Sequence, residues 1–114
     1  MYTTNKKIIE KISDRCIRIN EVVKEINYDR AIFDLDINIK EICCFNILQI
    51  GELVRCLDKS FIIVHREIEW SKIIGMRNIV AHGYGNIDFD IVWDVANKDI
   101  IALNKFCTTI LKNL

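Results

Sequence analysis

Residues 5–26, which read NKKIIEKISDRCIRINEVVKEI, carry the clearest structural signal in the chain. Apolar side chains recur in this stretch every three or four residues, at Ile9, Ile12, Cys16, Ile19, Val23 and Ile26. This spacing puts them on one face of an α-helix, because a helix has 3.6 residues per turn. The stretch therefore predicts a long helix with one buried face, which ends where residues 27–30 break the pattern.

A second helix is predicted over residues 34–57. One of its apolar stripes consists of Ile39, Cys43, Ile47, Ile50, Val54 and Leu57. Phe45 and Leu48 lie on the opposite side of the same predicted helix. A helix that is apolar on two sides either occupies the centre of a bundle or shares one face with a second chain, and the sequence leaves both arrangements open.

The remaining segments complete an all-α pattern. Residues 60–69 are ambiguous, but a lone strand would have nothing to pair with, so we expect a turn of helix or a loop there. A third helix is predicted over residues 70–81, ended by Gly83 and Gly85. Asp88 is a candidate N-cap for a last helix, in which apolar residues repeat to the end of the chain.

Composition is consistent with one folded domain, residues 1–114. The chain contains no proline and only four glycines, which favours long uninterrupted helices. Four main helices with short connections predict an antiparallel bundle of four to five helices. The formal net charge is zero, so a strongly basic nucleic-acid-binding protein is not indicated. Any RNA contact would need a local patch or a groove between two chains, with local cations such as Lys72, Arg77, Lys6, Lys7 and Lys11.

Cysteine usage predicts a reduced protein. The five cysteines are an odd number and four of them have apolar neighbours, and no signal peptide is seen. We therefore expect free thiols acting as small core residues in a cytoplasmic protein. No metal site is expected, because there is no CxxC pair and His65 and His82 lack partners at ligand spacing. The longest uncharged run, residues 42–51, is too short to span a membrane.

One charged residue stands out in residues 70–84, WSKIIGMRNIVAHGY. On a helical wheel Arg77 falls in the middle of an apolar side formed by Trp70, Ile73, Ile74, Val80 and Ala81. A guanidinium there needs an anion, because an unpaired buried charge is costly. One interpretation is an internal ion pair with Glu52, Asp34 or Asp36. The other is that Arg77 binds a phosphate, which suits its planar fork of donors.

His82 and Tyr84 follow Arg77 at the expected end of this helix. A histidine there either makes a favourable contact with the helix dipole or takes part in chemistry. Gly83 and Gly85 flank Tyr84, and the missing side chains would let a ligand approach closely. The other interpretation of Tyr84 is a half-buried packing residue with its hydroxyl in water.

The string Arg77-Asn78-Ile-Val-Ala-His82-Gly-Tyr84 resembles the R-x4-H-x-Y motif of HepT-like toxins in the HEPN superfamily. Residues 49–52 resemble the family's Ile-Gly-Glu element, and residues 70–78 resemble the lead-in to its motif. Ile87, Asp88 and Trp93 resemble elements that follow the motif. The resemblance covers roughly residues 34–103, most of the chain.

The resemblance implies a HEPN-like helical bundle that forms a homodimer and cleaves RNA without a metal or other cofactor. The RNA 2′-OH would attack the adjacent phosphate, leaving a 2′,3′-cyclic phosphate and a 5′-OH. His82 would be general base or acid and Arg77 would hold the phosphate. Asn78 would orient the phosphate or His82, or help to cap the helix.

The same resemblance implies a partner, a minimal nucleotidyltransferase antitoxin that transfers AMP to Tyr84. The two would form a toxin–antitoxin system. An alternative from the same resemblance is a non-catalytic dimer that binds a nucleotide or the nucleotidyltransferase. A third possibility is a plain helical domain in which Arg77 makes only an internal salt bridge.

Overall fold

The computed structural model describes residues 2–81 and 84–113, and within these ranges the fold is all-α with no strand. The long elements are α1 (Tyr2–Glu25), α3 (Ile37–Val54), α5 (Trp70–Ala81) and a continuous rod made of α6 (Phe89–Asp94), the π-helical η2 (Val95–Asp99) and α7 (Ile100–Lys112). Short helices α2 (Arg30–Leu35), α4 (Lys59–Val64) and the 3-10 turn η1 (Tyr84–Asn86) connect them. These four long segments confirm the predicted helical bundle.

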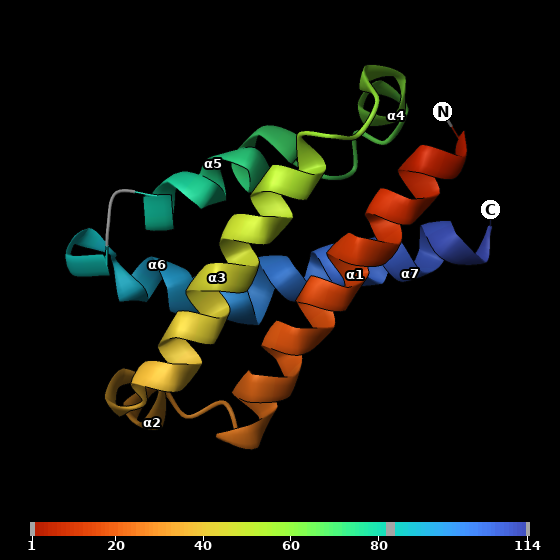
Figure 1. Cartoon of the computed structure of the whole chain (residues 1–114). Helices are drawn as coiled ribbons and strands as arrows, with labels where there is room; N and C mark the ends of the chain where they lie inside the picture. The colour runs from red at the N-terminus through yellow and green to blue at the C-terminus, as the bar shows by residue number, and fades with distance from the viewer. Residues whose placement is uncertain (1, 82–83, 114) are drawn as a thin grey trace.

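The helices pack around α3, as Figure 1 shows. Helices α1 and α3 run antiparallel side by side, whereas the α6–α7 rod crosses behind them. Helix α5 packs against the C-terminal half of α3. Helix α3 is therefore central, which is one of the two arrangements that the sequence left open, although Phe45 on its outer side is 52% exposed.

The first helix follows its prediction closely. The predicted face is buried, with Ile9, Ile12, Cys16 and Ile19 fully inaccessible to solvent. The helix is followed by Asn27 and Tyr28, whose φ angles are 54° and 57°. Left-handed residues of this kind end a helix, because they turn the chain out of the right-handed hydrogen-bonding pattern.

The second predicted helix, residues 34–57, is wrong in its first part, because the chain forms two helices there. Asp29 caps α2 by accepting a hydrogen bond of 2.9 Å from the Ala31 amide. Asp36 leaves the helical conformation and caps α3 by accepting a bond of 3.1 Å from the Ile39 amide. An aspartate that satisfies the free amides of a new first turn favours restarting the helix over continuing the old one.

The other boundaries agree with the sequence. Residues 59–64 form the turn of helix α4 that was one of the two expected outcomes. Asp88 caps the last helical rod, accepting from the amides of Asp90 and Ile91. The π-helical stretch η2 in the middle of that rod was not predicted. Its Asp99 accepts a hydrogen bond of 2.9 Å from Lys72, which ties the rod to α5.

The thiols occupy the places expected of them. All five cysteines are free; Cys16, Cys43, Cys44 and Cys107 are buried and Cys56 is exposed. Burial raises the pKa of the Cys43 thiol to about 12 and that of Cys44 to about 11. The buried cysteines therefore act as small apolar residues of the core.

No helix among the described residues is long and apolar enough to cross a membrane. Within residues 2–81 and 84–113, no three histidine, cysteine or acidic side chains gather closely enough to hold a metal ion.

Candidate active site

The candidate site begins with a close approach of two helices at Gly51. Gly51 is buried in α3, and a Cβ atom there would lie 2.9 Å from Cβ of Arg77 and 3.6 Å from the carbonyl oxygen of Ile73. Only glycine fits this space without displacing α5. The missing side chain thus lets the backbone of Arg77 sit directly against α3.

The Arg77 side chain meets Glu52, the next residue of α3. Nε of Arg77 lies 3.1 Å from Oε1 of Glu52, and the two side chains keep 31% and 49% of their surface exposed. Nε itself is buried, and its N–H does not point well enough at any described acceptor to form a hydrogen bond. Arg77 and Glu52 thus form an ion pair, but the N–H of Nε does not make a hydrogen bond to the carboxylate.

This ion pair decides between the three carboxylates that the sequence offered. Asp34 pairs with Arg30 at 2.8 Å, and Asp36 caps α3 through its side chain. Glu52 is the partner of Arg77. Because both members remain partly exposed, the pair does not enclose the guanidinium, and solvent reaches the site.

Arg77 lies on the side of α5 that faces α3, and its side chain is partly buried there. Among the α5 residues whose side chains the structure describes, those buried are Trp70, Ile73 and Met76, and Met76 was not expected among them. Cβ of Arg77 lies against Gly51 of α3, while 31% of its side chain remains exposed. This partial exposure keeps the charge of the guanidinium hydrated on one side.

The structure describes the other residues of the motif to different extents. Asn78 is exposed in the last part of α5, directly after Arg77. The backbone of Tyr84 opens the 3-10 turn η1. His82 lies outside the described residues. The structure therefore brings Arg77 together with Glu52, and leaves the roles of His82 and Tyr84 as predictions.

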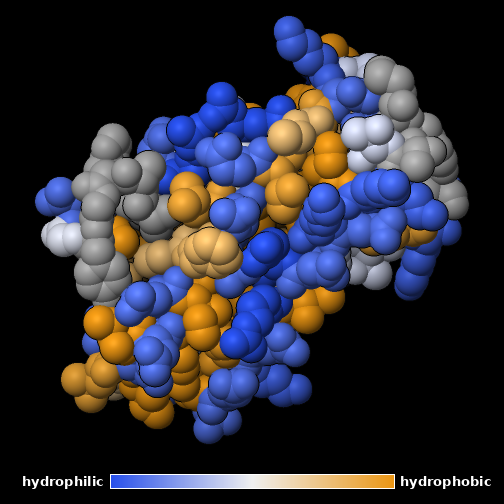
Figure 2. Space-filling model, viewed as in Figure 1, coloured by the Kyte–Doolittle hydropathy of each residue, from blue (hydrophilic) through white to orange (hydrophobic). Residues whose placement is uncertain are grey.

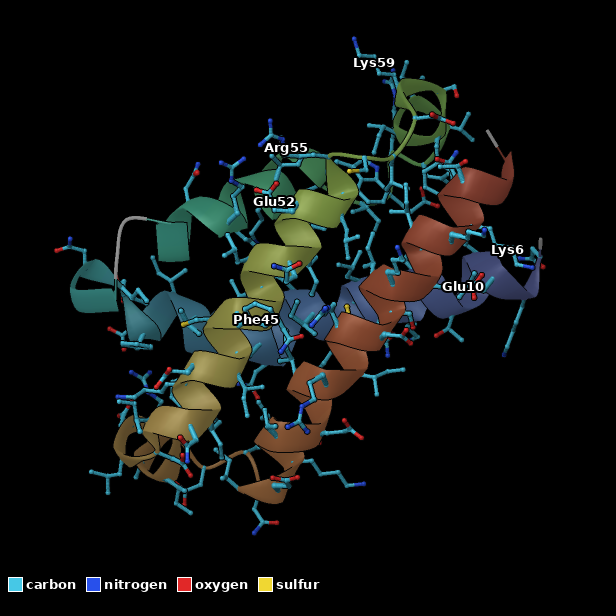
Figure 3. All side chains as sticks on the ribbon, in the orientation of Figure 1. Lys6, Glu10, Phe45, Glu52, Arg55 and Lys59 are labelled. Atoms are coloured by element: carbon cyan, nitrogen blue, oxygen red, sulfur yellow. The ribbon has the colours of Figure 1, made fainter. Side chains whose placement is uncertain are left out.

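Two neighbours of this ion pair were not singled out from the sequence for a site role. Gly51 has a steric role that its place in a buried helix beside Glu52 could have suggested. Arg55 is exposed just beyond Glu52 at the C-terminal end of α3, and Figure 3 shows the two labelled side chains at this same end. By contrast, the cation Lys72 is engaged with Asp99, and that hydrogen bond raises the pKa of its ammonium group.

Comparison with known proteins gives a consistent result. The family model described as "Ribonuclease HepT-like" matches residues 7–110. The chain is 30% identical over 109 residues to "Putative RNase TTE0752" of Caldanaerobacter subterraneus subsp. tengcongensis, covering 96% of each chain. It is 27% identical over 103 residues to "Probable ribonuclease HepT" of Thermococcus cleftensis, covering 90% of this chain and 92% of the relative. No solved structure gives a significant match. The match over nearly its whole length shows that the chain belongs to the HepT-like ribonuclease family.

Proposed function

We propose that the protein is a metal-independent endoribonuclease whose active site is built on Arg77 and His82. The observation that carries the proposal is the state of Arg77, whose Nε is buried beside Glu52 while 31% of the side chain stays exposed. A guanidinium held on one edge and open on the other can offer its terminal nitrogens to a phosphate. The names of the relatives support RNA as the substrate.

The reaction we propose is an internal transesterification. The 2′-OH of RNA attacks the adjacent phosphorus while His82 takes its proton as general base. The bond from phosphorus to the 5′-oxygen breaks, and that oxygen receives a proton from a general acid. The products are a 2′,3′-cyclic phosphate and a 5′-OH. Arg77 donates to the non-bridging oxygens, where charge builds in the transition state.

A homodimer would supply the second proton carrier. One imidazole cannot easily take a proton and give another in the same step, so we propose that His82 of the partner subunit is the general acid. Asn78, exposed beside Arg77, would help to orient the phosphate. Both assignments require the two motif segments to lie near one cleft.

We further propose that the protein is the toxin of a toxin–antitoxin pair, silenced by a minimal nucleotidyltransferase. The hydroxyl of Tyr84 would attack the α-phosphate of ATP, forming a phosphodiester to AMP and releasing pyrophosphate. AMP at this position, two residues from His82, adds bulk and negative charge where the RNA phosphate would bind. The test is the intact mass of the protein coexpressed with the nucleotidyltransferase, where one or more added AMP units are expected and Tyr84→Phe should show none.

The test of the nuclease is cleavage of RNA in the presence of EDTA. The wild-type protein should give products with 2′,3′-cyclic phosphate ends, and His82→Ala should abolish cleavage while gel filtration shows the same dimer. Equal loss of RNA with wild type and with His82→Ala would indicate contamination by another nuclease and would contradict the proposal.

A second candidate is a non-catalytic dimer that binds a nucleotide or the nucleotidyltransferase. The observation in its favour is that Arg77 already has an anionic partner in Glu52 without any substrate. This candidate is favoured if the wild type leaves RNA intact while the dimer still binds ATP or copurifies with the nucleotidyltransferase.

A further inference from the structure

A cationic groove lies between α1 and α3, on the face of the molecule shown in Figures 2 and 3. Its volume is about 430 Å³, and it is lined by Lys11, Arg15 and Arg18 from α1 and by Asn46, Gln49 and Leu53 from α3. A second hollow of about 510 Å³ continues it along α3 past Phe45. In Figure 2, hydrophilic side chains border an exposed apolar area on this face.

Arg15 is fixed at the centre of this groove. Its Nη1 donates a hydrogen bond of 3.2 Å to Oδ1 of Asn46, which is only 3% exposed. The amide nitrogen of Asn46 donates in turn to the carbonyl oxygen of Ile42 at 2.8 Å. The guanidinium of Arg15 also lies 5.4 Å from the ring centroid of Phe45. Two contacts thus hold this cation in place at a partly exposed position.

The other two cations extend this arrangement along α1. Lys11 and Arg18 are four residues before and three after Arg15, so all three share one face of the helix at intervals of about one turn. Arg18 approaches Glu21 only at 3.9 Å, with both side chains at least half exposed. Such a pair is weak in water and leaves Arg18 available to another anion.

The groove also contains carboxylates. Asp14 lines its first part and Glu41 its second part. The residues that line the two hollows are thus three cations and two carboxylates, with Glu21 lying outside this lining near Arg18. The lining carries a small positive balance in a chain whose total formal charge is zero. The sequence required a local patch for any RNA contact, and this groove is the candidate for such a patch.

The exposed ring of Phe45 adds a second kind of contact. An aromatic side chain that is 52% exposed beside a row of cations is the combination that binds single-stranded nucleic acid. Bases stack on the ring while phosphates contact the cations, and neither contact depends on the base sequence of the nucleic acid. A duplex keeps its bases stacked inside, so it could not use Phe45 in this way.

The groove connects to the candidate active site along α3. Phe45, Gln49 and Glu52 follow one another at intervals of four and three residues, so they form one stripe of the helix. Figure 3 shows Phe45 and Glu52 labelled on the same face of α3. At 1.5 Å per residue their levels differ by about 10 Å along the helix axis. A strand of a few nucleotides can therefore span from Phe45 to the guanidinium of Arg77.

We infer that the α1–α3 groove binds single-stranded RNA and guides it to Arg77. Phosphates contact Lys11, Arg15 and Arg18, and one base stacks on Phe45. This inference rests on the proposed nuclease function and adds a substrate-binding surface to it.

The test measures binding and cleavage separately. Binding is followed by fluorescence anisotropy of a labelled 12-nucleotide single-stranded RNA whose 2′-oxygens are methylated, so that it cannot be cleaved, at several salt concentrations. Cleavage is followed on the dinucleotide UpA, which is too short to fill the groove. Circular dichroism and gel filtration check the fold and the oligomeric state of every variant.

The expected result is a loss of binding without a loss of chemistry. Arg15→Ala combined with Arg18→Ala should weaken binding about tenfold at low salt. It should also reduce the slope of log affinity against log salt by about 1.4, because each phosphate contact on a single strand contributes about 0.7. Arg15→Lys combined with Arg18→Lys keeps the charges and should retain most of that slope. Cleavage of UpA should stay within about twofold of wild type.

Variants of Phe45 test the stacking contact, and a variant of a cation outside the groove is the control for the charge changes. Phe45→Ala should weaken binding about tenfold with an unchanged salt slope, because stacking releases no counterions, whereas Phe45→Trp should bind as wild type. Lys24→Ala, on the same helix but outside the groove, should change neither affinity nor slope.

Two outcomes would overturn the inference and a third would overturn the nuclease itself. Wild-type affinity and slope in the double alanine variant, with UpA still cleaved, would show that RNA does not use this groove. A change of oligomeric state with unchanged RNA affinity would make the groove a protein interface. Failure of the wild type to cleave any RNA would count against the proposed function, whatever the binding result.

Discussion

Nε of Arg77 lies 3.1 Å from Oε1 of Glu52, yet this buried N–H makes no hydrogen bond to any described group. The carboxylate therefore neutralises one edge of the guanidinium without using its full hydrogen-bonding capacity. Such a contact restrains the arginine while leaving its exposed side free for another anion. Glu52 is, in our proposal, a positioning residue for Arg77.

Replacement of Glu52 tests this positioning role. Glu52→Ala should lower the kcat of RNA cleavage by about tenfold or more, because a misplaced cation stabilises the transition state poorly. The melting temperature should change little, since a pair this exposed contributes only about 0–1 kcal/mol. Glu52→Gln keeps an oxygen near Nε and should recover part of the rate. Cleavage by Glu52→Ala at the wild-type rate, in single-turnover assays, would refute the role.

The rate of cleavage should depend on the geometry of the Arg77 side chain as well as on its charge. Arg77→Lys keeps the positive charge but loses the planar fork, so cleavage should fall by about a hundredfold. Arg77→Ala should be at least as severe. Rates measured with EDTA present, together with the oligomeric mass from light scattering, distinguish lost chemistry from a changed assembly. A lysine variant as active as wild type would show that only the charge is required.

Gly51 should be intolerant of even one methyl group. Gly51→Ala would force its Cβ to within 2.9 Å of Cβ of Arg77, so we expect a destabilisation of about 1–3 kcal/mol and reduced cleavage. Gly75 is the matched control, because a Cβ there meets nothing within 4 Å. Gly75→Ala should be neutral or stabilising by up to about 1 kcal/mol, since alanine favours the helix. Urea unfolding of the two variants provides the measurement, and equal stabilities would contradict the steric argument.

Thiol labelling should separate the exposed cysteine from the four buried ones. In the folded protein at pH 8, Ellman's reagent should react rapidly with one thiol per chain, and Cys56→Ser should remove that reaction. Burial keeps the other thiols protonated; the pKa of Cys107 is raised to about 12. In guanidinium chloride all five should react. Rapid labelling of more than one thiol in the folded state would show that the core is open.

The same pKa shifts predict a loss of stability in alkali. In the unfolded chain the thiols lose their protons near pH 9, whereas in the folded chain burial raises the pKa of Cys43 and Cys107 to about 12. The raised pKa therefore stabilises the fold fully below about pH 9, and this contribution is lost as the pH rises towards 12. Each thiol should remove roughly 1 kcal/mol per pH unit above 9. Urea titrations at pH 8 and pH 10.5 measure the fall, and Cys107→Ala should make it smaller.

Much of the fold was predictable from local patterns. The buried face of α1 and the N-cap Asp88 could be identified because helix periodicity and capping act over a few residues. The break before α3 was missed, since Asp36 can belong to a helix or cap one, and the sequence pattern does not distinguish the two. The π-helical stretch Val95–Asp99 was also missed, because its apolar spacing does not differ visibly from that of an α-helix.

The candidate site was predictable only in part. The sequence by itself determined the helical class, the free core thiols and the presence of Arg77 among apolar neighbours, because these follow from residue type and spacing. The choice of Glu52 over Asp34 and Asp36 was decided only by the tertiary structure, as was the grouping of Arg15 with Asn46 and Phe45. Such contacts join residues far apart in the chain, and they depend on how closely two helices approach, which here is governed by the missing side chain of Gly51.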